Sequence, residues 1–148
     1  MWGNFVHRTL AFIAKYRDGV LPTSPVSPEI REQAIRAYTK VGERIEKGCF
    51  KDALETIFEL VRLGNKYYDA AQPWKTRTSD LKACDQTLAD CAYLIANLAT
   101  LLHPFLPFSC EKIFGWLGNG TAWEEQTVAA QTLPEDLSVL YERMEETD

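Results

Sequence analysis

The side chains best suited to recognition chemistry are a polar pair near the start of the sequence and a tryptophan halfway along. Asn4 and Arg8 lie four positions apart, the spacing that puts two side chains on one face of a helix. An amide both donates and accepts hydrogen bonds, and a guanidinium donates several. Trp74 directly follows Pro73 and offers a flat ring. Taken alone, Asn4 and Arg8 are typical of the solvated surface of a helix. A tryptophan that follows a proline at a helix end typically packs into the core.

The sequence contains no arrangement that indicates catalysis or metal binding. It has no Ser-His-Asp or Cys-His spacing and no glycine-rich phosphate loop. The four cysteines form no C-x-x-C pair and have no paired histidines, which argues against zinc. Cys84 and Cys91 lie seven apart on a predicted helix, and we expect both to be small buried core residues. We therefore expect no catalytic residue and no metal site in this chain.

Charge and composition narrow the classes of partner. The chain has 148 residues, 46% of them hydrophobic and 25% charged, which is typical of a folded globular domain. No apolar run is long enough to span a membrane and the start does not read as a signal peptide, so we expect a cytoplasmic protein without a membrane partner. The net charge of -5 resides entirely in the stretch from Glu135 onward, and residues 1–134 sum to zero. A broad basic surface for DNA or any other nucleic acid is therefore excluded, and any nucleic-acid role must be local and base-directed.

Helical periodicity accounts for most of the chain, and strand-like alternation is absent from the sequence. The predicted helices are 2–17, 28–47 after a cap at Ser27, 51–71, about 80–102 and 109–117. The third carries the apolar stripe Ala53, Ile57, Val61, Gly64 and Tyr68. The fourth is apolar around much of its circumference, which indicates the central helix.

These elements predict an all-α fold, an antiparallel bundle of four to five helices joined by short loops. We expect residues 1–120 to form the bundle and residues 121–148 to form an irregular acidic tail that packs on it or extends beyond it. Trp116 and Trp123 are expected to be packing residues. We expect Pro73 to mark the end of the third helix or the turn just after it.

Four stretches, in order along almost the whole chain, resemble one family, the anticodon-binding domains of methionyl-tRNA synthetases, which are class I aminoacyl-tRNA synthetases. They are NFVHRTLAFIAKYRDGVLP, NKYYDAAQPWK, LATLLHPFLPFSCEKIF and LSVLYERMEE. The second matches the family's N-x-Y-x-x-x-x-x-P-W pattern, and the third its L-x-P-F-x-P-x-x-x-E-K-I pattern. Many relatives have Asn at the position of His7, so the resemblance assigns His7 no role.

The resemblance implies a methionine-accepting tRNA as partner, recognised at its CAU anticodon. It makes Asn4, Arg8 and Trp74 the anticodon-reading residues, with Trp74 stacking on the first base. The cytosine edge offers two acceptors beside one amino donor, which a guanidinium and an amide match. For Trp74 to reach Arg8, we expect the third helix to run antiparallel to the first. Cations that could hold backbone phosphates nearby are Lys15, Lys66, Lys75 and Arg77.

The family places a catalytic domain before this bundle, with H-I-G-H-like and K-M-S-K-S-like signatures that handle ATP. Neither signature occurs in this sequence. The resemblance therefore implies a chain that binds tRNA without doing chemistry and holds no cofactor, because ATP and methionine would bind the catalytic domain of the same synthetase. That domain would be its second partner.

Two alternatives stay open. Leucyl, isoleucyl, valyl and cysteinyl synthetases carry related helical domains, so the amino acid could differ. In a different class, the chain could be a helical protein-interaction module whose acidic tail and exposed aromatic residues meet another protein.

Overall fold

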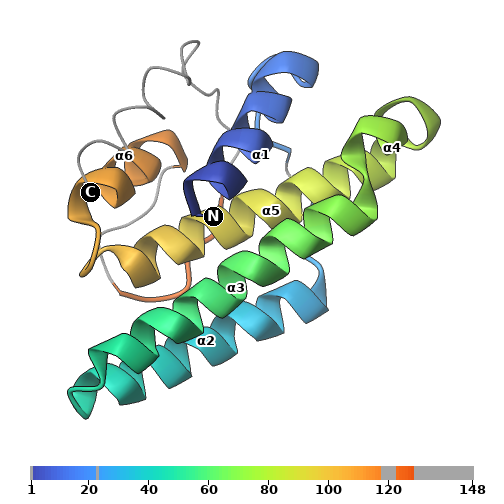
Figure 1. The fold of residues 1–148 in the computed structure, drawn as a ribbon. Coiled ribbons are helices and arrows are strands. Elements are labelled where there is room, and N and C mark those ends of the chain that lie inside the picture. Colours follow the sequence, from blue (N-terminus) through green and yellow to red (C-terminus); the bar gives the residue numbers. More distant parts are fainter. Residues whose placement is uncertain (1, 23, 118–122, 129–148) are drawn as a thin grey trace.

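The computed structural model is a bundle of α-helices joined by short connections (Figure 1). It describes residues 2–22, 24–117 and 123–128. The helices in these ranges are α1 Trp2–Tyr16, α2 Pro28–Glu46, α3 Phe50–Ala71, α4 Pro73–Ser79, α5 Leu81–Leu102 and α6 Pro107–Leu117. The predicted all-α fold class is confirmed, and the short helix α4 adds to the predicted elements.

Helix α5 is the centre of the bundle. Every residue from Thr87 to Leu102 is buried, so this helix is covered on all sides, as its nearly continuous apolar sequence predicts. Helices α2 and α3 lie side by side and antiparallel on one flank of α5, and α1 and α6 lie on the other (Figure 1). The predicted stripe of α3 is buried throughout.

Helix boundaries follow the local signals in the sequence. Pro28 is the first residue of α2, and Gly48, with φ 74°, ends the α2 to α3 turn in the left-handed region that glycine favours. The Asp80 side chain caps α5 by accepting a hydrogen bond from the Ala83 amide at 3.2 Å. Helix α1 ends at Tyr16, before the left-handed residues Asp18 and Gly19.

Pro73 acts as a start signal as well as a stop signal. Gln72 adopts a left-handed conformation with φ 51°, which ends α3, and Pro73 then occupies the first position of α4. Proline fits there because the first turn of a helix needs no amide donor from it. Trp74 consequently lies in the first turn of a helix, after a sharp change of direction.

A row of polar side chains on α5, here called the polar seam, consists of Gln86, Asp90, Tyr93 and Asn97. Asp90 is fully buried, and its carboxylate accepts hydrogen bonds from four donors: the Ser27 amide at 2.8 Å, the Ser27 hydroxyl at 2.6 Å, the Tyr67 hydroxyl at 2.6 Å and the Gln86 amide at 3.0 Å. Ser27 is the predicted N-cap residue of α2, but its side chain makes no cap hydrogen bond because it is directed to Asp90 instead. The seam thus ties the connector before α2 to the centre of the bundle.

The same seam holds residues 123–128. The Gln126 amide donates to Asn97 Oδ1 at 2.7 Å, and Asn97 Nδ2 donates to the Gln126 carbonyl at 3.0 Å. Glu125 accepts from the Tyr93 hydroxyl at 2.6 Å and from Arg31 of α2 at 2.8 Å. This part of the tail therefore packs on α2 and α5. The predicted boundary at 120 and the tail from 129 onward lie outside the described residues.

The tryptophans and cysteines expected in packing positions are found there. Trp116 is buried, and Trp123 packs edge-on against Tyr38 with ring centroids 5.2 Å apart while keeping 41% of its surface exposed. Cys84 and Cys91 are both fully buried, as predicted.

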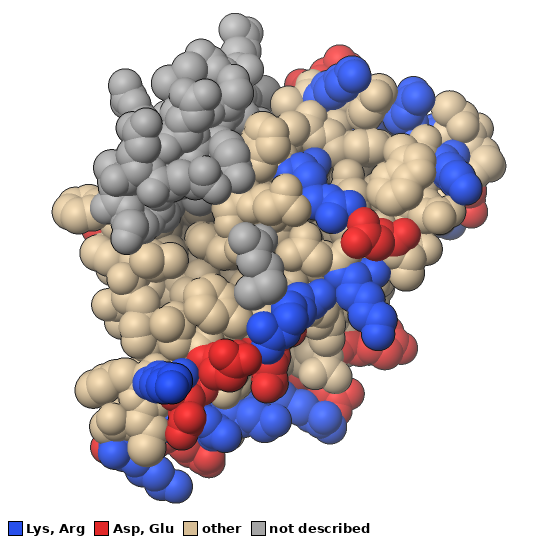
Figure 2. All heavy atoms as spheres, in the orientation of Figure 1, with Lys and Arg blue, Asp and Glu red and all other residues tan. Residues whose placement is uncertain are grey.

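The surface of the described residues carries charges of both signs. Along α2 and α3, Lys and Arg alternate with Asp and Glu on the face shown in Figure 2. Over residues 2–22, 24–117 and 123–128, no helix is long and apolar enough to cross a membrane. Within the same ranges, no group of three or more His, Cys, Asp or Glu is arranged to hold a metal ion.

Candidate functional site

Helix α1 crosses α3 at a glycine. The ring of Phe5 lies so close to Gly64 that a Cβ there would be 2.6 Å from Phe5 Cζ. Gly64 belongs to the predicted apolar stripe of α3, and Phe5 is fully buried. Because the glycine has no side chain, the Phe5 ring of α1 can lie directly against α3 at Gly64, and the residues one turn further along each helix are brought together.

Arg8 lies one turn beyond this crossing and stacks on a tyrosine of α3. Its guanidinium carbon is 4.1 Å from the centroid of the Tyr68 ring. The same guanidinium forms an ion pair with the neighbouring Asp69. Burial raises the pKa of Tyr68, and the nearby charge of Arg8 opposes that rise. The tyrosine is therefore a neutral ring that holds a cation by its face.

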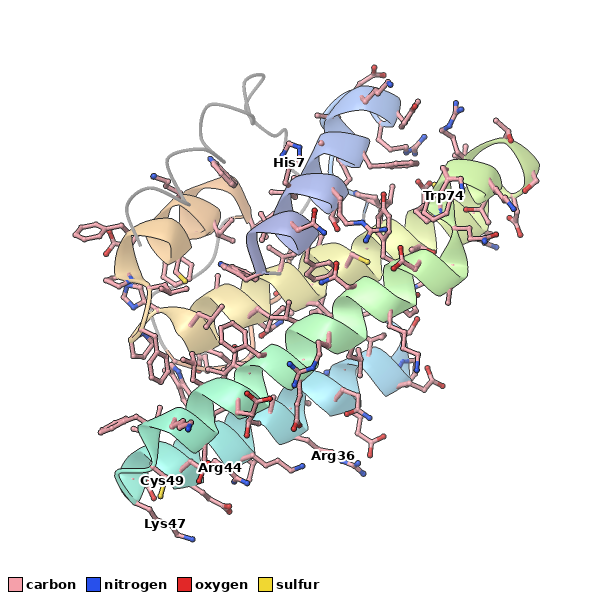
Figure 3. The ribbon with its side chains drawn as sticks, in the orientation of Figure 1. His7, Arg36, Arg44, Lys47, Cys49 and Trp74 are labelled. Atoms are coloured by element: carbon pink, nitrogen blue, oxygen red, sulfur yellow. The ribbon has the colours of Figure 1, made fainter. Side chains whose placement is uncertain are left out.

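Trp74 extends this arrangement at the start of α4. Its ring centroid is 5.9 Å from that of Tyr68, with the planes inclined by 43°. The turn that carries Trp74 is held against α5, because the Cys84 thiol of α5 donates a hydrogen bond to the Pro73 carbonyl at 3.6 Å. Trp74 is 43% exposed and projects from α4 at one end of the bundle (Figure 3).

Arg8, Tyr68 and Trp74 together form what we call the recognition stack. Tyr68 is buried and serves as its base, while Trp74 offers an exposed ring and Arg8 a partly exposed guanidinium. A guanidinium has five N–H donors, so Arg8 keeps donors for a ligand beyond the bond to Asp69. A flat ring beside fixed donors is what binding of an unpaired base requires.

A second group of side chains lies where the last turn of α1 meets α4. The guanidinium carbon of Arg77 is 4.2 Å from the centroid of the Tyr16 ring, and Lys15 Nζ is 5.1 Å from it. Tyr16 itself packs on Phe12, with ring centroids 4.7 Å apart. We call Lys15, Tyr16 and Arg77 the Tyr16 cluster.

The other predicted residues lie in different places. Asn4 is exposed on α1, one turn before Arg8, so it shares the face of α1 that carries the recognition stack. Lys75 is exposed beside Trp74. Lys66 lies apart from them and lines a groove between α2 and α3, together with Tyr67 and Glu29 among other residues. His7 is partly buried and extends from the side of α1 away from Trp74 (Figure 3).

The expected orientation of α3 relative to α1 is wrong. Phe5 meets Gly64 and Arg8 meets Tyr68, so the residue numbers increase in the same direction along both helices at their crossing. Both helices run toward the end of the bundle where α4 lies (Figure 1). Trp74 therefore comes near the second half of α1, not near its start, and the close approach at Gly64 brings it there.

Sequence reasoning missed the supporting residues of the site. Tyr68 was predicted only as part of the buried stripe of α3, and neither Asp69 nor Tyr16 was given a role in binding. One signal was available, since Asp69 is polar and directly follows a predicted core tyrosine near a candidate arginine partner. The pairing of Arg8 with Asp69, 61 positions apart, depends on how α1 crosses α3.

Comparison with known proteins assigns the chain to a family. The model of the family described as the anticodon-binding domain of tRNA ligases matches residues 28–148. The match covers more than half of the chain, and the chain belongs to this family of helical domains. The family predicted from the four quoted stretches is confirmed.

Proteins with high sequence identity to this chain are methionine–tRNA ligases. The chain is 47% identical over 148 residues to a methionine–tRNA ligase of Bacillus cereus strain 03BB102, and 45% identical over 145 residues to that of strain G9842. Each match covers 97% of this chain and 26% of the relative, so the chain spans about a quarter of the relatives' length. Its fold is similar to part of the Mycobacterium tuberculosis methionyl-tRNA synthetase bound by methionyl-adenylate, with a TM-score of 0.81, 25% identity, and coverage of 90% of this chain and 29% of that one.

Proposed function

We propose that this chain is the anticodon-binding part of a methionyl-tRNA synthetase and reads the CAU anticodon of methionine-accepting tRNA. The observation that carries the proposal is the recognition stack, in which Arg8 and the exposed ring of Trp74 are fixed by the buried Tyr68. The extended similarity to methionine–tRNA ligases supports the choice of amino acid.

Recognition begins with the first anticodon base turned out of the loop onto Trp74. Arg8 then donates to the two acceptors of cytosine, O2 and N3, and the Asn4 amide, which both donates and accepts, completes the edge. Asp69 holds the guanidinium of Arg8 in place before the base arrives. Because the donors are already oriented, little side-chain entropy is lost on binding.

Overall charge favours recognition by bases over attraction to a basic surface. Residues 1–134 carry no net charge, and the face of the described residues shown in Figure 2 carries charges of both signs. Methionine activation with ATP belongs, in this proposal, to a catalytic domain of the same synthetase. This chain contributes the choice of tRNA.

The test is the affinity of the chain for anticodon stem-loops that differ only in the anticodon. We expect CAU to be preferred over GAU, and Trp74→Ala to weaken CAU binding about tenfold or more, because stacking of a base on an aromatic ring is worth ~1 to 3 kcal/mol. Trp123→Ala is the matched control, since its ring is 41% exposed against 43% for Trp74 and it packs on Tyr38, outside the recognition stack.

Each outcome separates the proposal from its rivals. A preference for GAU would assign the domain to another synthetase of the same class, and binding without any anticodon preference would favour a protein-interaction module. Arg8→Gln should reduce the discrimination at the first anticodon base. An equal loss for every anticodon would instead make Arg8 a phosphate contact.

A further inference from the structure

The Tyr16 cluster brings two positive charges to one exposed ring. Arg77 comes from α4 and Lys15 from the last turn of α1, and their cationic groups lie 4.2 and 5.1 Å from the Tyr16 centroid. These two distances require the charges to lie within about 9 Å of each other. Tyr16 is 37% exposed, so the cluster faces solvent.

Lys15 and Arg77 differ from the nearby arginines, because each of those arginines is paired with a carboxylate. Arg8 is paired with Asp69, and Arg17 is paired with Asp85 at 2.9 Å. Among the described residues, no carboxylate forms an ion pair with Lys15 or with Arg77. Arg77 Nε is also shielded from solvent and has no hydrogen-bond acceptor within the same part of the chain.

The cluster is adjacent to the recognition stack. Trp74 and Arg77 are three positions apart on α4, so their side chains are neighbours on one helix face. Lys15 lies seven positions after Arg8, two turns further along the same side of α1. A nucleotide whose base stacks on Trp74 would therefore place an adjoining part of its backbone at the Tyr16 cluster.

We propose that Lys15 and Arg77, positioned by the ring of Tyr16, bind a backbone phosphate next to the base held by Trp74. The inference rests on the proposed function and adds a second subsite to it. Phosphate is the chemical class that fits this site. Its negative charge would balance the two cations that have no carboxylate partner, whereas the edge of a base is neutral and would not. Arg8, whose charge Asp69 already balances, suits the base edge instead.

Tyr16 is a positioning residue in this subsite. Its ring face attracts the guanidinium of Arg77 and restricts the freedom of a long side chain before the phosphate arrives. The ring is sufficient for this role, and the hydroxyl is not needed. Tyr16→Phe should therefore leave binding unchanged, whereas Tyr16→Leu should weaken it.

The experiment measures how the affinity of the 148-residue chain for the CAU stem-loop depends on salt. A phosphate contact contributes about 0.7 to the slope of log affinity against log salt for single strands. We expect Arg77→Gln and Lys15→Gln each to lower the slope by about that amount and to weaken binding about fivefold at 0.1 M salt, equally for CAU and GAU loops. Arg44→Gln and Lys47→Gln, at the other end of the bundle, are the matched controls (Figure 3).

A stem-loop series with a single uncharged methylphosphonate linkage locates the phosphate. One linkage beside the first anticodon base should weaken binding to the unmodified chain and have little effect on Arg77→Gln. An Arg77→Gln variant with altered anticodon preference, or with a slope change no larger than that of Arg44→Gln, would overturn this subsite while leaving the anticodon proposal intact. Loss of any CAU preference in the unmodified chain would overturn both.

Discussion

Replacing Gly64 with alanine tests whether the close approach of α1 to α3 builds the site. The added Cβ would lie 2.6 Å from Phe5 Cζ and 2.8 Å from Phe5 Cε2, distances that real Cβ contacts do not show. Phe5 is fully buried and its ring has no solvent-filled space into which to turn. The Phe5 ring, or α1 together with it, must therefore shift away from α3 to admit the methyl group.

The expected loss of stability follows from two opposing effects. Alanine is favoured over glycine inside a helix by roughly 0.5 to 1 kcal/mol. An extra methyl group in a packed core costs about 1 to 3 kcal/mol. We expect Gly64→Ala to lower the free energy of unfolding by about 1 to 2 kcal/mol, which lowers the Tm of a domain of this size by about 2 to 8 °C.

The assay is denaturant unfolding followed by circular dichroism, with Gly115→Ala as the control. Gly115 is exposed on α6, and nothing lies within 4 Å of the position its Cβ would take. The same substitution there should raise the free energy of unfolding by about 0.5 to 1 kcal/mol. Helix propensity favours alanine at both positions, so a loss of stability at Gly64 together with a gain at Gly115 separates the steric effect from helix propensity.

A second variant makes the reasoning specific to the Phe5 contact. Phe5→Leu removes the end of the ring that the new Cβ would meet, so the double variant should lose less stability than the sum of the two single variants. The reasoning is refuted if Gly64→Ala is as stable as the unmodified chain or if the two losses simply add. Because Arg8 lies one turn from Phe5, we also expect Gly64→Ala to weaken CAU binding under conditions where the domain is fully folded.

Three further predictions concern the bundle. Asp90→Asn should lower the free energy of unfolding by about 2 kcal/mol or more, measured by thermal unfolding, because an amide cannot accept from all four donors. Hydrogen bonding from Arg31 lowers the pKa of Glu125 in the folded state. The stabilisation of the fold by ionised Glu125 is therefore complete above the ordinary pKa of 4.5 and is lost as the pH falls below that value. Glu125→Gln should reduce the loss of stability in that pH range. A thiol reagent should modify Cys49 quickly in the native chain, whereas the other three cysteines are buried and burial raises the pKa of Cys91, so these should react only on unfolding.

Local patterns determine the helices well. The stripe from Ala53 to Tyr68 is buried as its spacing predicts, and the boundaries at Pro28 and Gly48 follow from residue type. Helix α4 was not predicted, because Pro73 was interpreted only as a helix terminator. A proline is equally suited to the first turn of a helix, and the left-handed Gln72 that separates the two helices has no strong sequence signal.

The features that the sequence did not predict depend on contacts between segments that are far apart along the chain. The resemblance indicated Arg8 and Trp74 as partners, but nothing in the sequence indicated the Tyr68 ring between them, and the predicted direction of α3 relative to α1 was wrong. Asp90 lies in the largely apolar sequence of α5, and its four donors come mostly from other segments of the chain. Such pairings depend on how helices cross, which periodicity along one helix does not specify.

The crossing at Gly64 also has a consequence for the order of folding. Helices α3, α4 and α5 follow one another through short turns, and their contacts, such as that of Tyr67 with Asp90 23 positions on, close smaller loops. The contact of α1 with α3 joins Arg8 to Asp69 across 61 positions and is slower to form for the same reason. A chain in which α3 to α5 have assembled would present the ring of Trp74 before Arg8 arrives, so the capacity to stack on a base precedes the capacity to identify it.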